Sequence, residues 1–416
     1  MSRSALGRGR APLKHPAFRR LWAAMGLSYA GDQLQVLAQA WLVATISQSA
    51  LAVGAIGIIG AVPQLFMPVG GVIADQADRR RLLVAGQLVG ASAALIVGIL
   101  VLTGQIALWH IYAWAFLAGL IWLISRPAFK VMLTESVPRE EVPAAAGLNS
   151  MTETSAMVAV NSLGSGLLAV LGLPLAFILN SVTYLLAGLI LRDPDARKRH
   201  LVQRRTFSAR RILPDLLDGL RYLAGQPLLL VPVLSTLALT IAAMPAFGLL
   251  AALVHKQGGS LVQLGLLSAT GSLGGLVGAA YAGVSQIRVD LRGRYGLYGL
   301  AAAAVLAIFA LVPIGYITSI LLAALGFLIF AEAVWNTSRV RLLAEPSYQA
   351  RLQSLTTMAF TLGSMLGLLW GGIAVDHFGS VALLGGAGAL AVVAVVQSIW
   401  TARNRRRRQV NGSSTQ

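Results

Sequence analysis

The sequence contains no cysteine and few charged residues, and each shortage excludes classes of protein. Without cysteine the chain has no disulfide framework, no thiolate metal ligand and no cysteine nucleophile. Charged residues make up 12% of its 416 residues, whereas soluble domains average about 25%. Its five histidines are scattered and show no zinc-binding spacing. We therefore exclude a soluble globular protein and expect neither a metal nor a cofactor.

Nucleotide-binding patterns are also missing. No G-x-x-x-x-G-K-[ST] motif occurs, which argues against an ATP-driven pump, and we expect no enzymatic activity. Glycines do recur about every four residues at 271–278 and at 363–371. That spacing predicts close packing between helices rather than a dinucleotide fingerprint.

Long apolar runs dominate the chain, in which 56% of the residues are hydrophobic and the mean hydropathy is +0.74. Roughly 20 apolar residues in a helix cross the hydrocarbon core of a bilayer. Twelve stretches qualify: 21–46, 51–74, 82–102, 108–125, 144–171, 173–191, 228–254, 262–283, 295–313, 317–338, 352–375 and 380–400. Because the runs do not alternate with period two, helices are favoured over a β-barrel. The predicted fold is an all-α membrane protein with twelve transmembrane helices.

The positions of the basic residues predict the orientation in the membrane. The chain has 33 Lys and Arg against 15 Asp and Glu, a net charge of +18. All of the basic residues except Lys256 fall at the two ends or in alternate connections, as cytoplasmic retention of positive charge requires. We expect an integral protein of the bacterial cytoplasmic (inner) membrane with both termini cytoplasmic. Contact with anionic lipid explains the basic loops, so no nucleic acid partner is expected.

The longest break between spans divides the chain into two halves. We expect a basic cytoplasmic tail, two six-helix bundles joined by a cytoplasmic linker, and a second basic tail, over 1–20, 21–191, 192–227, 228–400 and 401–416. Leucines at helical spacing in the linker predict an amphipathic helix in the interface, although a plain linker helix would show the same pattern. Trp122-x3-Arg126 recurs as Trp335-x3-Arg339. Such repeated halves are typical of transporters with a substrate site at the midplane.

A charged motif follows the second span. The segment GGVIADQADRRR at 70–81 resembles the signature loop of the major facilitator superfamily, matching it at Gly71, Asp75, Arg79 and Arg80, while Asp78 replaces the usual glycine. The segments FRRLW at 18–22, GD at 31–32 and LNS at 179–181 resemble the enterobactin-exporter-like (transmembrane secretion effector) branch of that superfamily.

The resemblance implies a secondary transporter that works by alternating access, with the loop as a latch of the outward-facing state. Gly71 is expected to allow close helix approach, and Asp75 to bind a helix N-terminus or an arginine. A simple stop-transfer cluster is the alternative. Two features depart from the family: Asn161-Ser162 stands where its antiporters have Gly-Pro, and Arg126 ends the predicted fourth span instead of lying inside it.

Carboxylates deep in spans are costly and are therefore candidates for proton coupling. Three qualify: Asp32, Glu153 and Glu332. Polar residues on the same helix faces are candidates for lining the substrate cavity: Ser28, Gln35, Gln39, Asn149, Trp335 and Asn336. For Asp32, these neighbours predict a row of hydrated polar side chains (a wet stripe) along one face of a cavity-lining helix. The alternative for Asp32 is a hydrogen-bonded packing role beside Gly31.

Together these observations predict a monomeric transporter that exchanges protons for lipophilic or amphiphilic small molecules, such as multidrug substrates or siderophores, and exports them. With no Lys or Arg well inside a predicted span, neutral or cationic substrates are favoured. A lysolipid flippase, another major facilitator uptake carrier, and a non-transporting membrane sensor or scaffold are the alternatives.

The charge asymmetry makes a topology prediction. Single cysteines introduced at Ser208 and at Gln257, in a chain with none of its own, should label differently in whole cells. An impermeant thiol reagent added outside should modify position 257 and spare position 208. The opposite labelling pattern would show that the orientation is inverted.

The motif makes a second prediction. Asp75→Asn should impair transport while leaving membrane insertion and expression nearly unchanged, since the lost charge serves one conformational state. Asp78→Asn should impair transport less. Transport by the Asp75 variant at the parent's rate, measured at matched protein level, would remove the latch interpretation.

Overall fold

The computed structural model describes residues 11–192, 212–285 and 294–413, which form helices and connecting turns with no strand among them. The described chain separates into two compact units. The N-terminal unit comprises residues 1–47, 59–209 and 260–269, and the C-terminal unit comprises residues 48–58, 210–259 and 270–416. The predicted all-α fold is confirmed.

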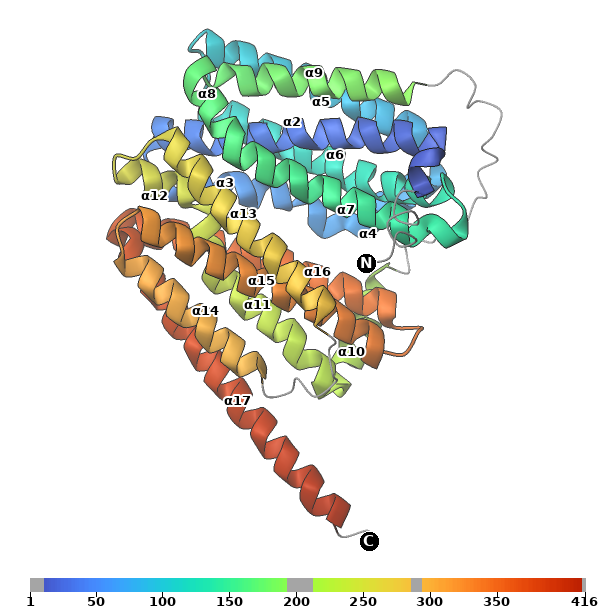
Figure 1. Ribbon diagram of the computed structural model, residues 1–416, viewed down its shortest axis with the longest axis vertical. Helices are drawn as coiled ribbons and strands as arrows, with labels where there is room; N and C mark the ends of the chain where they lie inside the picture. Colours follow the sequence, from blue (N-terminus) through green and yellow to red (C-terminus); the bar gives the residue numbers. More distant parts are fainter. Residues whose placement is uncertain (1–10, 193–211, 286–293, 414–416) are drawn as a thin grey trace. The chain divides into compact units, whose positions relative to one another are not determined.

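The N-terminal unit is a bundle of long helices (Figure 1). Its elements are η1 (Ala11–Lys14), α2 (Pro16–Ser47), η2 (Pro63–Phe66), α4 (Met67–Gln76), α5 (Arg79–Leu102), α6 (Leu108–Glu135), η3 (Arg139–Glu141), α7 (Val142–Ala159), η4 (Val160–Gly164), α8 (Ser165–Leu171) and α9 (Pro174–Leu191). Helix α9 packs between α2 and α5. At one end of this bundle a cluster that includes Phe18, Leu83 and Leu133 is almost fully buried. This core packs α2 and α6 into one bundle and so positions the polar residues that these helices carry.

The C-terminal unit is also a helix bundle. Its elements are α10 (Ile212–Gly225), α11 (Pro227–Gly248), α12 (Leu250–Lys256), α14 (Arg294–Leu311), α15 (Tyr316–Leu343), α16 (Gln349–Phe378), η8 (Gly379–Ala382) and α17 (Leu383–Ser413). Most of α13 (Leu261–Val284) belongs here too. Helix α11 packs against α16, α17 and α14 (Figure 1).

The repeated glycines pack as predicted. A Cβ added at Gly274 would lie 2.6 Å from the Cα of Ala323, and one at Gly278 would lie 2.7 Å from the Cα of Phe327. Helices α13 and α15 therefore approach at a distance that only glycine allows on α13.

Helical elements occupy all twelve predicted spans. Eight candidate spans in the described chain are long and apolar enough to cross a membrane, and Ala50–Phe66 and Gly296–Leu311 are shorter apolar helices. One of the eight, Arg351–Trp400, contains the last two predicted spans. Predicted span 5 contains a π-helical turn, η4, which includes Asn161 and Ser162. The helical irregularity therefore lies where the family's Gly-Pro would stand, and π turns are frequent at functional sites.

The fourth predicted span lies within a longer helix. Helix α6 runs to Glu135, nine residues past Arg126, so the helix is longer than the predicted span. Its 28 residues exceed the roughly 20 that cross a bilayer, and the position of Arg126 at the end of the span stays a prediction. The apolar run does stop at residue 125, but the helix continues because its last turns pack within the bundle. At 1.5 Å per residue, Arg126 lies about 14 Å inside the end of α6.

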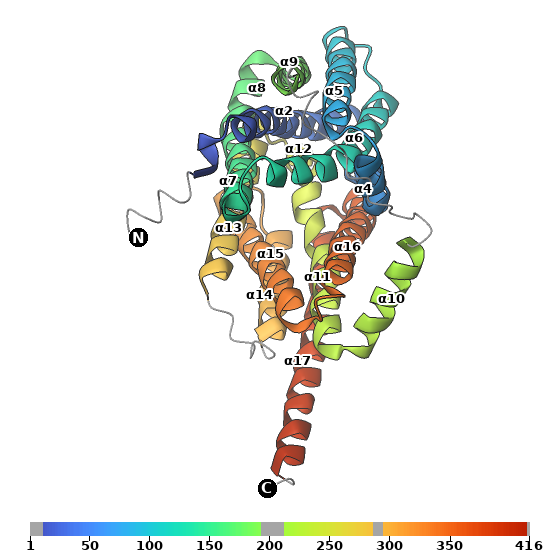
Figure 2. The same ribbon diagram turned by 90° about the vertical axis from the view of Figure 1, so that its right-hand side faces the viewer.

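The linker contains the predicted helix, α10, which lies beside α16 (Figure 2). Asp218 forms an ion pair with Arg351 at 2.5 Å. The rings of Tyr222 and Tyr348 stack with centroids 4.0 Å apart. The nearby Asp218 carboxylate raises the pKa of the Tyr348 hydroxyl above its ordinary value. These contacts attach α10 to the C-terminal unit, so it is more than a plain connection.

Two short segments belong to the unit opposite to their place in the sequence. The start of α3 (Ala50–Ala61) groups with the C-terminal unit, and the start of α13 groups with the N-terminal unit. The first residues of α3 therefore lie beside α12 and α16, two helices that are about 200 and 300 residues away in sequence.

Candidate functional site

The signature loop lies between α4 and α5, where it anchors helix ends. Asp78 caps the N-terminus of α5 by accepting hydrogen bonds from the backbone N–H groups of Arg80 and Arg81 at 3.0 and 3.1 Å. The Arg80 Nε donates to the last carbonyl of α9, that of Leu191. Asparagine also caps helices well, which supports a mild effect for Asp78→Asn.

The signature loop also reaches α6. Arg79 forms an ion pair with Glu135 at 3.1 Å. The expected close approach is made by Gly70 and not by Gly71: an added Cβ at Gly71 would have no atom within 4 Å, whereas one at Gly70 would collide with the backbone of Leu123. Asp75 lies in the last turn of α4, and its side chain is outside the described part of the structure.

Asp32 lies in the middle of α2 within a polar cluster of the N-terminal unit. Its carboxylate accepts hydrogen bonds from the Asn180 amide at 3.3 Å and from the Tyr184 hydroxyl, both on α9. The same Asn180 amide also donates to Gln35. Gly31 makes room for these contacts, since an added Cβ there would collide with the Asn180 side chain. Sequence analysis noted Asn180 only as part of the LNS segment and missed Tyr184, because both face Asp32 only through the packing of α9 on α2.

The polar neighbours of Asp32 on α2 are almost fully buried. Ser28, Gln35 and Gln39 are 2–4% exposed, and the Ser28 hydroxyl donates to Gln87 on α5 at 3.2 Å. In this structure polar groups on α5 and α9 surround Ser28 and Gln35, and a cavity-lining role for the three side chains stays a prediction.

A second polar cluster joins α6 and α7. Glu153 accepts a hydrogen bond from the Asn149 amide at 3.1 Å and lies 3.6 Å from the Arg126 guanidinium. The guanidinium carbon is 4.1 Å from the centre of the Trp122 ring. The structure thus brings the predicted residues Asn149 and Glu153 together and adds Trp122 and Arg126 to them.

Glu332, in the C-terminal unit, is 6% exposed on α15. It accepts a hydrogen bond from Asn336 at 3.4 Å. Asn336 also donates to the Thr236 hydroxyl at 2.7 Å. Trp335 is buried and faces the neighbouring helices instead, with its ring centre 4.8 Å from that of Tyr298.

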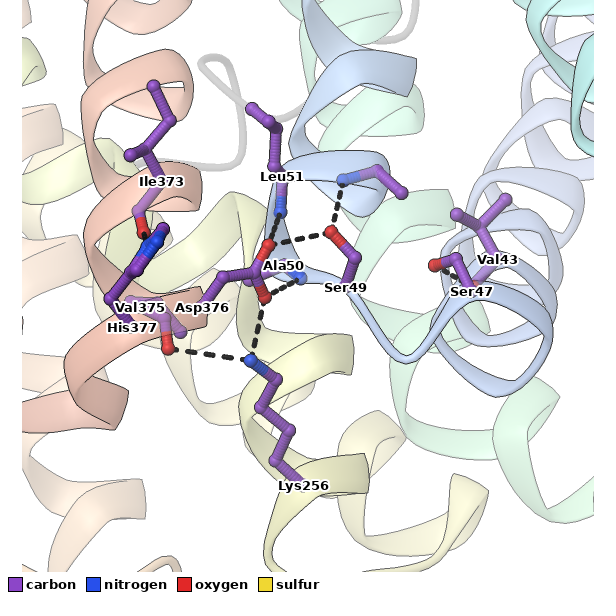
Figure 3. Close-up of polar contacts among 11 residues, drawn as sticks. Val43, Ser47, Ser49, Ala50, Leu51, Lys256, Ile373, Val375, Asp376 and His377 are labelled. Atoms are coloured by element: carbon purple, nitrogen blue, oxygen red, sulfur yellow. Dashed lines mark hydrogen bonds and ion pairs between the residues drawn. The ribbon is translucent and has the colours of Figure 1, made fainter.

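Asp376, near the end of α16, has the densest set of polar contacts in Figure 3. Its carboxylate accepts hydrogen bonds from the backbone N–H groups of Ala50 and Leu51 at 2.7 and 3.1 Å and from the Ser49 hydroxyl at 2.6 Å. It also pairs with the Lys256 ammonium at 2.7 Å. One carboxylate therefore holds the first turn of α3 and the end of α12 against α16.

Sequence reasoning missed Asp376, although a signal was present. Lys256 is the one basic residue that the predicted topology leaves outside the cytoplasm, and Asp376 follows the end of a span on that same side. A lone cation and a carboxylate at equivalent depth are natural partners. Among the described residues no group of three potential metal-ligating side chains lies together.

The contacts of Asp376 make a prediction about stability. Asp376→Ala should lower the stability of the C-terminal unit by about 1–2 kcal/mol, because the first turn of α3 loses its cap. Lys256→Gln should cost less, since a partly exposed ion pair contributes about 0.2–1 kcal/mol. Thermal unfolding of the purified protein in detergent measures both. Equal midpoints for the Asp376 variant and the parent would contradict the capping role.

Comparisons with known proteins agree with this architecture. The profile of the transmembrane secretion effector family matches residues 8–414. A relative from Bacillus subtilis (strain 168), the uncharacterized MFS-type transporter YfiS, is 26% identical over 235 residues, which span 54% of this chain and 54% of YfiS. The similarity to this curated relative therefore extends over about half of its length.

Two solved structures show the same fold. One is a bacterial homologue of the iron transporter ferroportin in the inward-facing state, with a TM-score of 0.71 and 17% identity, covering 92% of this chain and 98% of that one. The other is the nucleoside transporter NupG, with a TM-score of 0.71 and 13% identity over the same shares. With a family match over nearly its whole length and this fold, the chain belongs to the transmembrane secretion effector family of the major facilitator superfamily transporters.

Proposed function

We propose that this transporter is a proton-coupled exporter of lipophilic or amphiphilic small molecules, including drug-like compounds or siderophores. It works as a monomer in the bacterial cytoplasmic membrane, with both termini cytoplasmic, by alternating access. The family description, a secretion effector, supports the outward direction. The geometry of Asp32 is the observation that carries the proton coupling.

Asp32 is placed to bind and release a proton. It lies 16 residues after Pro16, the first residue of α2, which is about 24 Å along the helix. Its hydrogen-bond donors, Asn180 and Tyr184, are neutral. An ionised carboxylate with neutral partners is costly inside a membrane bundle, and a bound proton removes that cost. Asn180 and Tyr184 can stabilise the charged form while the proton is absent.

A single carboxylate is energetically sufficient for export. One proton that moves down a potential of 100 mV releases about 2.3 kcal/mol. Because about 1.4 kcal/mol corresponds to a tenfold concentration ratio, exchange for a neutral substrate sustains a gradient of about 40-fold from the potential alone. A pH difference across the membrane adds to that gradient.

The other two carboxylates rank behind Asp32. Glu332 is buried with the neutral partner Asn336 and is the second candidate for proton coupling. Glu153 lies beside the Arg126 cation and is therefore better suited to a fixed charge pair. This order predicts a larger loss of coupling for Asp32→Asn than for Glu332→Gln, and the smallest loss for Glu153→Gln.

Transport in proteoliposomes tests the function. Purified protein is reconstituted and a panel of lipophilic compounds is followed under an imposed proton gradient. Asp32→Asn should abolish uphill transport, while downhill movement or binding persists because asparagine keeps the size and a hydrogen-bonding group. Glu140→Gln, a change at an exposed carboxylate of η3, is the matched control and should transport like the parent.

Two outcomes would contradict the proposal. If Asp32→Asn concentrates substrate as the parent does, Asp32 has a structural role and Glu332 is the next candidate. If the parent moves compounds only inward, or moves none of the panel, the exporter proposal is wrong, and the uptake-carrier or sensor alternative replaces it.

A further inference from the structure

Helix α6 presents two cations and an aromatic ring on one face. Trp122, Arg126 and Lys130 are spaced four residues apart, so successive side chains lie one turn from each other. Glu153 on α7 is the carboxylate facing them. It lies 11 residues after the start of α7 and Arg126 lies nine residues before the end of α6, so both are about 14–17 Å from the ends of their helices.

The donors of the two cations are largely unused. Arg126 donates no hydrogen bond to any residue that the structure describes, and its distance of 3.6 Å from Glu153 exceeds that of a charge-assisted hydrogen bond. The Trp122 ring, 4.1 Å away, fixes the position of the guanidinium group. Lys130 forms no ion pair with the described part of the chain and has an exposed side chain. Arg126, held by Trp122, and the exposed Lys130 thus both retain hydrogen-bond donors that no described residue uses.

This face is open to solvent. The side chains of Arg126 and Glu153 are 30% and 28% exposed, which is far more than Asp32's neighbours Gln35 and Gln39. Charged side chains inside spanning helices face water-filled cavities rather than lipid, because exposure to hydrocarbon is costly. Protein therefore does not cover the charged groups of Arg126, Lys130 and Glu153, as a binding site for a solute requires.

The charges of this cluster do not cancel. Arg126 and Lys130 carry two positive charges and Glu153 carries one negative charge, which leaves one cation uncompensated. We propose that this cluster binds the oxyanion head, a carboxylate or a phosphate, of an amphiphilic substrate. Guanidinium and ammonium groups one turn apart on a helix suit such a head. This proposal replaces the sequence-based preference for neutral or cationic substrates with a substrate that has an anionic head.

Equilibrium binding to the purified full-length protein tests this site. Octyl phosphate and octyltrimethylammonium, an anion and a cation with the same tail, are titrated calorimetrically into phosphatidylcholine nanodiscs, with empty nanodiscs subtracted. The parent should bind octyl phosphate and prefer it. Arg126→Gln and Lys130→Gln should each weaken its binding about tenfold, as expected for loss of a charge-assisted contact. Arg139→Gln, which removes an exposed cation of η3, is the control and should change binding by less than about twofold.

A gain of affinity separates this role from misfolding. Glu153→Gln removes the negative charge beside Arg126, so it should strengthen octyl phosphate binding several-fold, which a damaged protein would not do. Absence of octyl phosphate binding to the parent, equal binding of the cationic probe, or unchanged binding in both the Arg126 and Lys130 variants would overturn the site.

The inference rests on the proposed transport of amphiphiles, but its test does not require transport. Binding of octyl phosphate without movement of any compound in proteoliposomes would support the anion site and contradict the exporter proposal. Transport by a parent protein that does not bind octyl phosphate would contradict the anion site and support the exporter proposal.

Discussion

The cost of an unpaired charge away from water is the constraint on which the rest of this structure depends. Charged side chains at the helix ends find partners: Arg79 pairs with Glu135 and Lys256 pairs with Asp376. Where a carboxylate lies deep in a bundle, as Asp32 does, neutral donors surround it. Each charge inside the spans is therefore a candidate for function, because an apolar residue would be less costly there.

Helix ends provide the second set of partners for these charges. Exposed N–H groups at a helix N-terminus attract carboxylates, and exposed carbonyls at a C-terminus attract cations. Asp78 at the start of α5, Arg80 at the end of α9 and Asp376 at the start of α3 follow this rule. The first two belong to the signature loop. In the C-terminal unit Asp376 caps the start of α3, although it lies on α16, more than 300 residues away in sequence.

The charged residues inside the N-terminal unit form two groups, which differ in their partners and in their exposure. Asp32 accepts hydrogen bonds from the neutral groups of Asn180 and Tyr184, which supports the proposed exchange of a proton. Arg126, Lys130 and Glu153 are partly exposed, and two of them keep free donors. The proposed proton site and the proposed head-group site lie on neighbouring helices, α2 and α6, so small movements of one bundle would couple the two ligands.

The sequence by itself determined the helical membrane fold, the approximate spans, the signature loop and the family, because hydrophobic length and charge asymmetry are local properties of the chain. It also identified Asp32, Glu153 and Glu332 as costly carboxylates. Only the tertiary structure decided the partners of Asp32 and Glu153, since Asn180 and Arg126 come from other helices. It likewise extended α6 beyond its apolar run and brought Asp376 to α3, because packing between helices depends on contacts that no local pattern records.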